Sequence, residues 1–420
     1  MTPRPAGIRW TPAVILGRAV RIAARLRKKG GGSAVPGLVV NRFAPGFLGS
    51  VLSSFPEGLV VVTGSSGKST TTKMLVTILE AHGKRVFTNP STANISQGLT
   101  SALLERASLT GRIDADMAVL EMDEGHGALL SPQFEARLVL LTNVMTDQID
   151  RFHDSEKVVG MLDTIARRAT ERLVLNGDDA MLDAMAADTH DTALARFGVT
   201  AEVFDSLPRG LGYAQTTPGR DSEGTLVSRV DGRSASIRWD GFDHDVTLPA
   251  RGVHYAVDAA AAIAASRELL GDAFESTTAV DAVSSVRAVF GRGEVVTVRG
   301  KRIEFVLVQN PASFQLNVDE LEEGLDQVMV AMGSDVADPS YFWPVDASRI
   351  GRARIVSGSK ADEMALQLLY QHVQVDEIDA DLPAALDRFI ALPEPETGVK
   401  TIVFTADPMR RTRSHLGLAQ

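Results

Sequence analysis

The stretch from Leu59 to Glu80 constrains this chain more than any other part of it. An apolar run, Leu59 to Val62, is followed by a short turn bounded by glycines and then by a helical pattern that opens with Lys-Ser-Thr. This order indicates a buried strand, a tight loop and a helix. Glycines let backbone amides approach an anion, and the free N–H groups of a helix N-terminus point at the same place. The stretch therefore predicts a phosphate-binding loop.

The residues of this loop have expected roles in binding a nucleotide. Lys68 would reach the outer phosphates, and the hydroxyl of Ser69 would bind Mg²⁺. The other expected nucleotide contacts in the loop are Gly64, Ser65, Ser66, Gly67 and Thr70. The common phosphate-loop pattern has a glycine where this chain has Val62, so the loop matches the shorter Gly-x-x-Gly-Lys-Ser/Thr form. The alternative is a strand–turn–helix connection that binds nothing.

Composition limits the remaining possibilities. A chain of 420 residues that is 44% hydrophobic is long enough for two or three domains with sizeable cores. The formal net charge of −10 argues against general nucleic-acid binding. The absence of cysteine excludes disulfides and zinc sites built from cysteine. Since no run of 18 apolar residues occurs, we expect a cytoplasmic protein without a membrane span.

The first fifty residues, 1–50, differ from the rest. Between Ile8 and Lys29 every charged residue is basic, and the apolar residues are spaced as in an amphipathic helix. The simpler interpretation is a helix packed on the first domain; the alternative is peripheral contact with the anionic cytoplasmic face of a membrane. Gly30-Gly31-Gly32-Ser33 then predicts a flexible joint.

From residue 58 onward, predicted strands and helices alternate. This pattern favours a parallel sheet covered by helices on both faces, with ligands at the carboxyl ends of the strands. Glu121 ends one such strand and is the candidate second Mg²⁺ ligand; the alternative is a helix cap or surface acid beside Asp123 and Glu124.

Other polar groups follow later strands. Asp147, Asp150 and Arg151 are expected to form a set of loop salt bridges, with a role in the site as the alternative. Asn176, with the Asp178-Asp179 pair before a helix, is expected to be structural, because aspartate is a good helix cap.

The pattern predicts a central ATP-binding domain at 51–290 and a second α/β domain at 291–420. Residues 200–250 read as a small antiparallel β insertion. Arg292, between Gly291 and Gly293, could swing its guanidinium onto a phosphate or serve as a solvent-exposed hinge. In the second domain the expected helices include one at 318–324.

Taken in order, these motifs resemble the Mur ligases, and within that family its MurT branch. The resemblance rests on the phosphate loop, the strand ending in Glu121, Asp147-x-x-Asp150-Arg151, Gly252-x-His254 and Phe290-Gly291-Arg292. Likeness to the MurT branch adds Leu120-Glu121-Met122-Asp123-Glu124, Asn310-Pro311-Ala312-x-Phe314 and Val356-Ser357-Gly358. Single motifs are weakly specific, whereas their order over nearly the whole chain is strong.

The resemblance implies a fold and a reaction. The fold would be a Mur ligase-like central P-loop ATPase domain followed by a C-terminal Rossmann-like α/β domain. The reaction would use ATP and Mg²⁺ to convert the α-carboxylate of D-glutamate in the lipid II stem peptide to an acyl phosphate. Ammonia from a GatD-like glutamine amidotransferase partner would then form the amide.

The resemblance also implies residue roles. Lys68 and Arg292 would stabilise the transferring phosphoryl group, and Ser69 and Glu121 would hold the metal. Nucleotide contacts would include Tyr255, Asp258 and Asn310, and Asp338 would complete the glutaminase site of the partner, with Asp335 as the fallback.

The chain also departs from the family. The cysteine zinc ribbon of many members is missing, so no zinc is expected, and Gln148 stands where several members have a metal-binding histidine. The family's His-Asn-x-x-Asn has become His254-Tyr255-Ala256-Val257-Asp258, and the segment before Asp338 is altered. Two alternatives therefore stay open: a ligase that joins another amine or amino acid to a carboxylate, and a non-catalytic ATP-binding scaffold.

Overall fold

The chain forms two compact units. The computed structural model describes residues 7–27, 34–90, 95–145, 154–189, 192–207, 209–217, 224–288 and 291–418. Unit 1 comprises Met1–Arg229, Ala235–Thr247 and Tyr255–Val286. Unit 2 comprises Val230–Ser234, Leu248–His254 and Arg287–Gln420.

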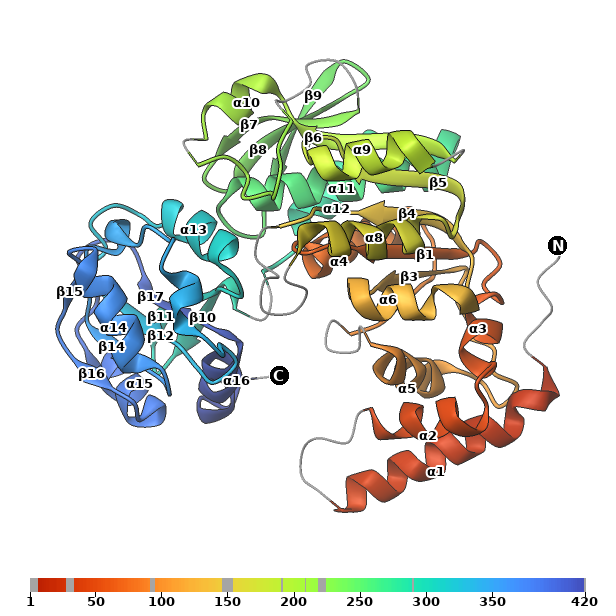
Figure 1. Ribbon diagram of the computed structural model, residues 1–420, viewed down its shortest axis with the longest axis horizontal. Helices are drawn as coiled ribbons and strands as arrows, with labels where there is room; N and C mark the ends of the chain where they lie inside the picture. Colours follow the sequence, from red (N-terminus) through yellow and green to blue (C-terminus); the bar gives the residue numbers. More distant parts are fainter. Residues whose placement is uncertain are drawn as a thin grey trace. The chain divides into compact units, whose positions relative to one another are not determined.

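Unit 1 is built on a nine-stranded sheet in the order β2-β3-β1-β4-β5-β6-β7-β8-β9 (Figure 1). Every pairing from β2 through β7 is parallel. The strands are β1 (Leu59–Thr63), β2 (Val86–Thr88), β3 (Met117–Glu121), β4 (Ala136–Leu141), β5 (Ala169–Asn176), β6 (Ala193–Val199), β7 (Thr225–Asp231), β8 (Ser234–Trp239) and β9 (Phe242–Thr247). The alternation of strand and helix had predicted this parallel α/β arrangement, which is confirmed.

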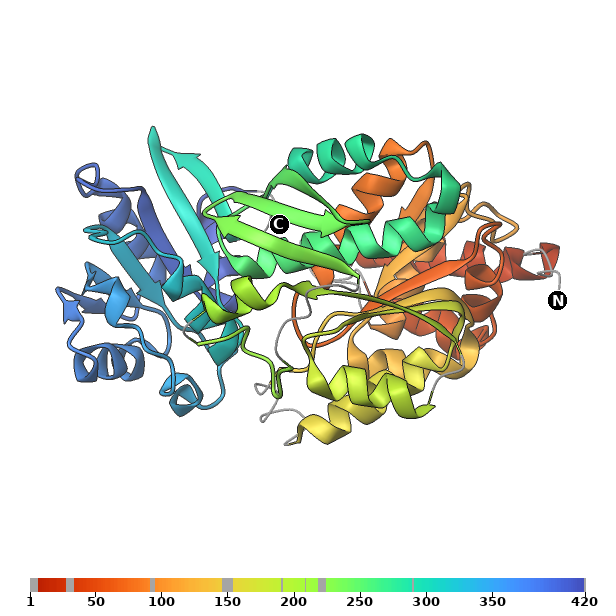
Figure 2. The same ribbon diagram turned by 90° about the horizontal axis from the view of Figure 1, so that it is seen from above.

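Helices cover both faces of the sheet, as Figure 2 shows. Alternate residues of a strand point to opposite faces, so Leu59 and Val61 of β1 join one core while Val60 and Val62 face the other side. The first core includes residues of α5 (Ser96–Arg106), α8 (Ser155–Ala166) and α9 (Ala180–Thr189), and α6 (Glu124–Leu130) lies beside α8. The opposite face carries α4 (Lys68–Ala81), α11 (Val253–Leu270) and α12 (Ser276–Ser285).

The predicted β insertion at 200–250 is not a separate body. It contains α10 (Ala201–Asp205) and the three strands β7 to β9, which extend the edge of the parallel sheet. Trp239 of β8 is buried and stacks on His244 at a centroid distance of 3.7 Å. This edge therefore closes with an aromatic contact, in a segment that contains no cysteine.

The N-terminal segment packs on unit 1 through helices. After the 3₁₀ turn Ile8–Trp10, α1 (Thr11–Arg27) lies along α2 (Val35–Phe43), and both contact α5 (Figure 1). Arg18 and Arg21 of α1 donate hydrogen bonds to the carbonyl oxygens of Ala107 and Ser101. The short α3 (Phe47–Leu52) then leads into β1. The packed helix that the sequence indicated is present.

Unit 2 has a six-stranded sheet in the order β10-β11-β17-β12-β14-β16. Only the β10·β11 pairing is antiparallel, and a separate parallel pair joins β13 and β15. The strands are β10 (Arg292–Val298), β11 (Lys301–Leu307), β12 (Val328–Ala331), β13 (Arg352–Ala353), β14 (Ile355–Ser357), β15 (Gln374–Val375), β16 (Ile378–Asp379) and β17 (Lys400–Phe404). Its helices are α13 (Pro311–Asp319), α14 (Ala361–Tyr370), α15 (Leu382–Ala391) and α16 (Ala406–His415).

One helix in unit 2 lies earlier than the sequence indicated. We expected a helix at 318–324, but α13 ends at Asp319. A capping box at Asn310 and Ser313, with Pro311 in the first turn, fixes the start of α13. Gly324, with a φ of +75°, lies in the turn beyond it.

Across the described residues, no helix is both long and apolar enough to cross a membrane.

Candidate functional site

The predicted phosphate loop has the backbone of an anion cradle. All five residues of β1 are buried, and the chain leaves the strand through Gly64, whose φ is +131°. Gly67, with a φ of +81°, is the cap residue of α4, which begins at Lys68. These left-handed conformations favour glycine, and they direct the free N–H groups of the first turn of α4 toward the loop. The strand, loop and helix are those the sequence predicted.

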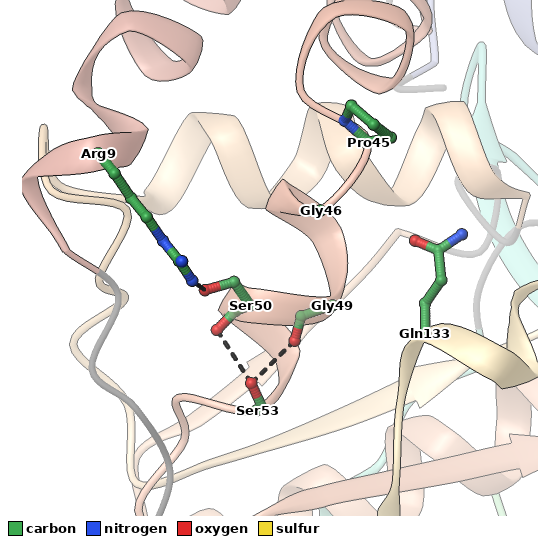
Figure 3. A pocket seen from close by; sticks show the side chains of 7 residues that line it. All are labelled: Arg9, Pro45, Gly46, Gly49, Ser50, Ser53 and Gln133. Carbon is green, nitrogen blue, oxygen red and sulfur yellow. Dashed lines mark hydrogen bonds between the residues drawn. The ribbon is translucent and has the colours of Figure 1, made fainter.

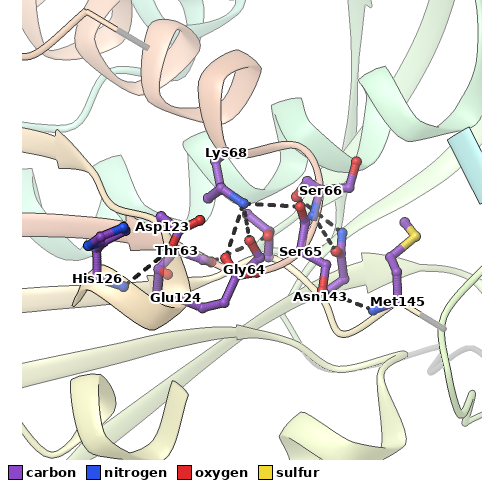
Figure 4. A network of polar contacts seen from close by, with 11 residues as sticks. Thr63, Gly64, Ser65, Ser66, Lys68, Asp123, Glu124, His126, Asn143 and Met145 are labelled. Atoms are coloured by element: carbon purple, nitrogen blue, oxygen red, sulfur yellow. Dashed lines mark hydrogen bonds and ion pairs between the residues drawn. The ribbon is translucent and has the colours of Figure 1, made fainter. Parts of the chain in front are cut away.

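The side chain of Lys68 contacts the backbone of the phosphate loop itself. Its ammonium donates hydrogen bonds to the carbonyl oxygens of Gly64 and Ser65, the latter at 3.0 Å. It also forms an ion pair of 3.5 Å with the carboxylate of Glu124 at the start of α6 (Figure 4). Glu124 is fully buried, and Glu121 is buried as well, so the alternative of a surface acid at Glu121 was wrong. The position of Glu124 after a cap residue gives no sign in the sequence that it turns inward.

A second loop, residues 142–145 after β4, is hydrogen-bonded to the phosphate loop. The amide of Ser65 donates to the carbonyl oxygen of Asn143 at 2.9 Å, and the amide of Ser66 donates to Asn143 Oδ1 at the same distance. Ser65 Oγ in turn accepts from the amide of Met145 at 3.1 Å. Figure 4 shows Asn143 and Met145 beside the two serines. Ser65 and Ser66 therefore anchor the loop, and Asn143 is a site residue that sequence reasoning missed.

Two buried polar side chains, Asp179 and Asn176, hold this second loop in place. Asp179 accepts hydrogen bonds from the amides of Val144, Met181 and Leu182, and burial raises the pKa of Asp179 to about 6. Asn176 donates to the carbonyl oxygen of Thr142 at 3.0 Å. The structural role expected for Asn176 and Asp179 agrees with these contacts, which connect the end of β5 to the second loop.

Glu121 lies next to the phosphate loop in the sheet. It pairs in register with Val62 of β1 and is only 4% exposed. The side chain of Asn89 brackets its backbone, since Asn89 Nδ2 donates to the Glu121 carbonyl and the Glu121 amide donates to Asn89 Oδ1, both at 3.0 Å. Asn89 therefore fixes the end of β3.

Ser69 and Glu121 suit a magnesium ion by chemistry. Both offer the oxygen ligands that Mg²⁺ prefers, one from the first turn of α4 and one from the end of the neighbouring strand β3. Among the described residues, no group of three or more histidine, aspartate or glutamate side chains could hold a metal by itself. Because Mg²⁺ commonly keeps several waters and binds substrate phosphates, two protein ligands fit this ion.

The predicted nucleotide contacts on α11 are buried. Asp258 Oδ1 accepts a hydrogen bond from Thr71 Oγ1 of α4 at 3.1 Å, and a Cβ on Gly67 would lie 2.2 Å from the same oxygen. Tyr255 is 4% exposed and lies one turn earlier. Asp258 thus packs directly against the helix cap at Gly67, which explains why a side chain cannot replace that glycine.

Arg292 and Asn310 belong to unit 2. Arg292 opens β10 between two left-handed glycines, at an irregularity in the pairing with β11. Arg292 is partly exposed, and its role toward a phosphate stays a prediction. Asn310 Oδ1 is already used, because it accepts from the amide of Ser313 as the cap of α13 at 2.6 Å.

Asp338 and Asp335 also belong to unit 2 and are both exposed. Asp338 accepts a hydrogen bond from the amide of Ser340 at 2.9 Å, and hydrogen bonds from Ser340 hold the pKa of Asp338 below its usual value. Asp335 accepts from Thr405 Oγ1 at 2.9 Å. Asp338 is thus an ionised surface carboxylate, whereas the carboxylate of Asp335 is hydrogen-bonded to Thr405, the residue after β17.

Several predicted features lie outside the described residues. These are the glycine-rich joint at 30–33, Asn94, which the sequence indicates as the start of a helix, the loop with Asp147, Gln148, Asp150 and Arg151, and Phe290.

A cavity of about 340 Å³ lies near the N-terminal helices (Figure 3). Its lining includes Arg9, Ser50 and Ser53, and Arg9 donates to Ser50 Oγ at 3.3 Å. No residue of the phosphate loop lines this cavity, so it is separate from the site described above.

Two family models together match most of the chain. The Mur ligase middle domain model matches residues 62–266, and the MurT ligase C-terminal model matches residues 307–406. The chain is 27% identical to the lipid II isoglutaminyl synthase (glutamine-hydrolyzing) subunit MurT of Streptococcus pneumoniae, over 82% of each protein. It is 24% identical to the Staphylococcus aureus protein of that name, over 87% of this chain and 89% of the relative.

Solved structures share the fold. MurF from Acinetobacter baumannii superposes with a TM-score of 0.67 at 16% identity, over 90% of this chain and 80% of that one. Folylpolyglutamate synthase of Mycobacterium tuberculosis, complexed with ADP and AMPPCP, has a TM-score of 0.62 at 16% identity, over 97% and 99%. The two family models and the geometry of the phosphate loop agree, and the chain belongs to the Mur ligase family of ATP-dependent ligases, with a C-terminal region of the MurT type.

Proposed function

We propose that this ligase amidates lipid II, with ammonia as the amine. The observation that carries the proposal is the presence of both family regions in one chain: the middle domain with an intact Gly64–Ser69 loop, and the MurT ligase C-terminal region. The relatives that match over most of their length are named for isoglutaminyl synthesis on lipid II. Amide formation from a carboxylate needs an activated acyl group, which a phosphate loop that binds ATP can supply.

In the proposed reaction, the α-carboxylate of D-glutamate in the stem peptide attacks the γ-phosphorus of ATP, giving an acyl phosphate and ADP. Ammonia then attacks the acyl carbon, and inorganic phosphate leaves with the bonding electron pair. Lys68 would stabilise charge on the transferring phosphoryl group from its place within the loop, and we propose the same role for Arg292. A magnesium ion bound by Ser69 and Glu121 would neutralise phosphate charge.

The ammonia would come from a GatD-like glutamine amidotransferase partner, which would meet a surface of unit 2 around Asp338. The segment that follows Asp338 is fixed by glutamines: Gln367 donates to the carbonyl oxygen of Phe342 at 2.6 Å, and Gln371 donates to that of Val345. Trp343, in the same segment, is 59% exposed. A rigid backbone with an exposed aromatic beside an ionised aspartate is suited to binding a protein partner.

Work on lipid II would bring the enzyme to the cytoplasmic face of the membrane, and α1 offers a surface for that contact. Over residues 11–24, for which side-chain exposure is described, the outward positions are apolar except Arg18: Pro12, Ile15, Leu16, Ala19, Ile22 and Ala23. They follow the helical spacing of a single seam, with Ile15 53% and Ile22 63% exposed. Since the segment is free of acidic residues in a chain of net charge −10, anionic lipid is the favoured contact.

A second candidate is a ligase that adds an amino acid instead of ammonia. The chain is 29% identical to the UDP-N-acetylmuramate--L-alanine ligase of Bifidobacterium longum subsp. infantis over 263 residues, which are 60% of this chain but only 48% of that protein. Because the match leaves out about half of the relative, it supports a shared ATP-dependent activation step but does not favour a particular amine. A non-catalytic scaffold is disfavoured because the loop keeps Gly67, Lys68 and Ser69.

The test is amidation of lipid II by the isolated chain with ATP, Mg²⁺ and free ammonia. We expect amidated lipid II by mass spectrometry and one ADP per product, and no turnover with the Lys68→Ala variant. ADP formation only when an amino acid replaces ammonia would favour the second candidate. Failure to bind any nucleotide would reject both ligase readings.

A further inference from the structure

Glu124 is an unusual group to find at a phosphate site. Its side chain is 0% exposed, and its carboxylate lies beside the loop that is expected to bind the negatively charged phosphates. A buried carboxylate is costly unless it is paired, and a phosphate placed nearby would repel it. The residue therefore needs a function that offsets these two costs.

The contacts of Glu124 are few and point to one partner. Glu124 Oε2 lies 3.5 Å from Lys68 Nζ, while Oε1 has no hydrogen-bond partner among the described residues. The neighbouring Asp123 has a different role, because its carboxylate accepts from the amide of His126 and caps α6. Lys68 is thus the cation that compensates the buried charge of Glu124.

The ammonium group of Lys68 has no donor left for a phosphate. An ammonium group has three N–H donors, and here they are directed to the carbonyl oxygens of Gly64 and Ser65 and to Glu124. A phosphate oxygen can bind Lys68 only by displacing one of these acceptors. The ion pair with Glu124 is the longest of the three contacts, and Glu124 is also the acceptor that carries a charge of the same sign as a phosphate.

We propose that Glu124 is the counter-charge of Lys68 in the nucleotide-free enzyme and competes with the nucleotide phosphates for that ammonium. Glu124 thereby keeps Lys68 seated in the loop before ATP arrives and weakens the hold on ADP after phosphoryl transfer. Glu124 is a positioning residue, since it acts through Lys68. The inference rests on nucleotide binding at the phosphate loop and is independent of the identity of the acceptor substrate.

The test is the affinity of the full chain for Mg²⁺-free ADP, measured by calorimetry, in the wild type and in Glu124→Gln. Removal of the competing charge should tighten ADP binding on the order of tenfold. The change should be smaller for AMP, which lacks the outer phosphate, and smaller when Mg²⁺ masks the phosphate charge. A merely structural role predicts the opposite sign, because a disturbed loop binds nucleotide less tightly.

Glu156→Gln is the matched control. Glu156 also lies in the first turn of a helix after an aspartate cap, in α8, but it is exposed. Its substitution changes the net charge equally and should leave ADP affinity unchanged. Equal tightening by both variants, or weaker binding by Glu124→Gln, would overturn the inference. Absence of ADP binding by the wild type would instead reject the nucleotide site, and with it the proposed function.

A second measurement covers the case in which Glu124→Gln does not fold. Lys68→Met leaves the Glu124 carboxylate buried without its cation, so its melting temperature should fall. The double variant Lys68→Met/Glu124→Gln should recover most of that loss. If the second substitution lowers the melting temperature further, the two residues do not form the pair that the proposal requires.

Discussion

Thr71 in α4 donates its hydroxyl hydrogen to the carboxylate of Asp258 in α11, at 3.1 Å. The same oxygen of Asp258 lies where a side chain on Gly67 would have to go. One carboxylate therefore packs against both the first turn of α4 and the glycine that caps it. The phosphate loop is closed on one side by α11 and on the other by Asn143.

Replacement of Gly67 by alanine should be much more harmful than its backbone angle alone predicts. Gly67 has a φ of +81°, and its new Cβ would lie 2.2 Å from Asp258 Oδ1. Gly83 is a matched control because it has the same φ and nothing within 4 Å. We expect Gly83→Ala to lower the free energy of unfolding by about 1 kcal/mol and Gly67→Ala by severalfold more, with loss of ADP binding. Denaturant unfolding and calorimetry would measure both; equal effects would contradict the steric argument.

Nucleotide affinity should fall as the pH drops through about 6. Burial raises the pKa of Asp179 to about 6, and its ionised carboxylate accepts from three backbone amides, including that of Val144. Protonation turns one acceptor into a donor and loosens the loop that holds Ser65 and Ser66. The ADP dissociation constant should therefore rise between pH 7 and pH 5.

The control for this prediction is Asp179→Asn, because the phosphates of ADP also titrate near pH 6. The variant should bind ADP more weakly at every pH, and the pH dependence that remains should come only from the titration of ADP itself. Identical pH profiles in the two proteins would assign the effect to another group. The fold should respond differently: a carboxyl pKa raised above its unfolded value makes this residue's contribution to stability larger as the pH falls from about 6 toward 4.

The stability of unit 2 should rise with pH in the alkaline range. Lys400 of β17 is fully buried, and burial lowers the pKa of its ammonium from 10.5 to about 8. Between about pH 8 and 10.5 the unfolded chain binds more protons than the folded chain, so the free energy of unfolding increases with pH, by about 3 kcal/mol at most. Lys400→Met should abolish this slope, whereas Lys157→Met, at an exposed position in α8, should keep it. Urea unfolding at a series of pH values would decide.

Binding to anionic vesicles should depend on the outer seam of α1. The double variant Ile15→Glu/Ile22→Glu removes two exposed apolar side chains and adds negative charge. We expect at least a tenfold loss of affinity for vesicles that contain phosphatidylglycerol, since each apolar side chain that is buried contributes about 1–2 kcal/mol. Leu366→Glu, exposed on α14, is the control. Equal vesicle binding by the wild type and the double variant would show that α1 is not the membrane contact. Loss of binding to a protein partner in the double variant would instead indicate that this face of α1 binds protein.

Asp338 should matter only when glutamine is the ammonia donor. In the reconstituted pair, Asp338→Asn is expected to lose at least tenfold in glutamine-dependent amidation while activity with free ammonia stays within twofold. Asp362→Asn, an exposed acid of α14, should leave both activities unchanged. Full glutamine-dependent activity of the Asp338 variant would end its proposed role, and the same experiment on Asp335 would test the fallback.

Much of the fold was accessible from the sequence because its signals are local. The apolar run before Gly64 predicted β1, and the strand ending at Glu121 was found by the same criterion. Tertiary contacts left no such signal. Glu124 contacts Lys68, which is 56 residues away, and Asn89, the residue after β2, is hydrogen-bonded to the backbone of Glu121. The misplaced helix at 318–324 shows that periodicity alone did not outweigh the capping box at Asn310.

The Thr71–Asp258 hydrogen bond also has a consequence for biosynthesis. Its two residues are 187 positions apart, so a ribosome adding about 5–20 residues per second makes the second roughly 10–40 s after the first. During that interval a nascent chain can carry the phosphate loop but cannot close it with α11. Fragments that end before α11 should therefore not retain nucleotide, and premature termination would yield products that do not sequester ATP.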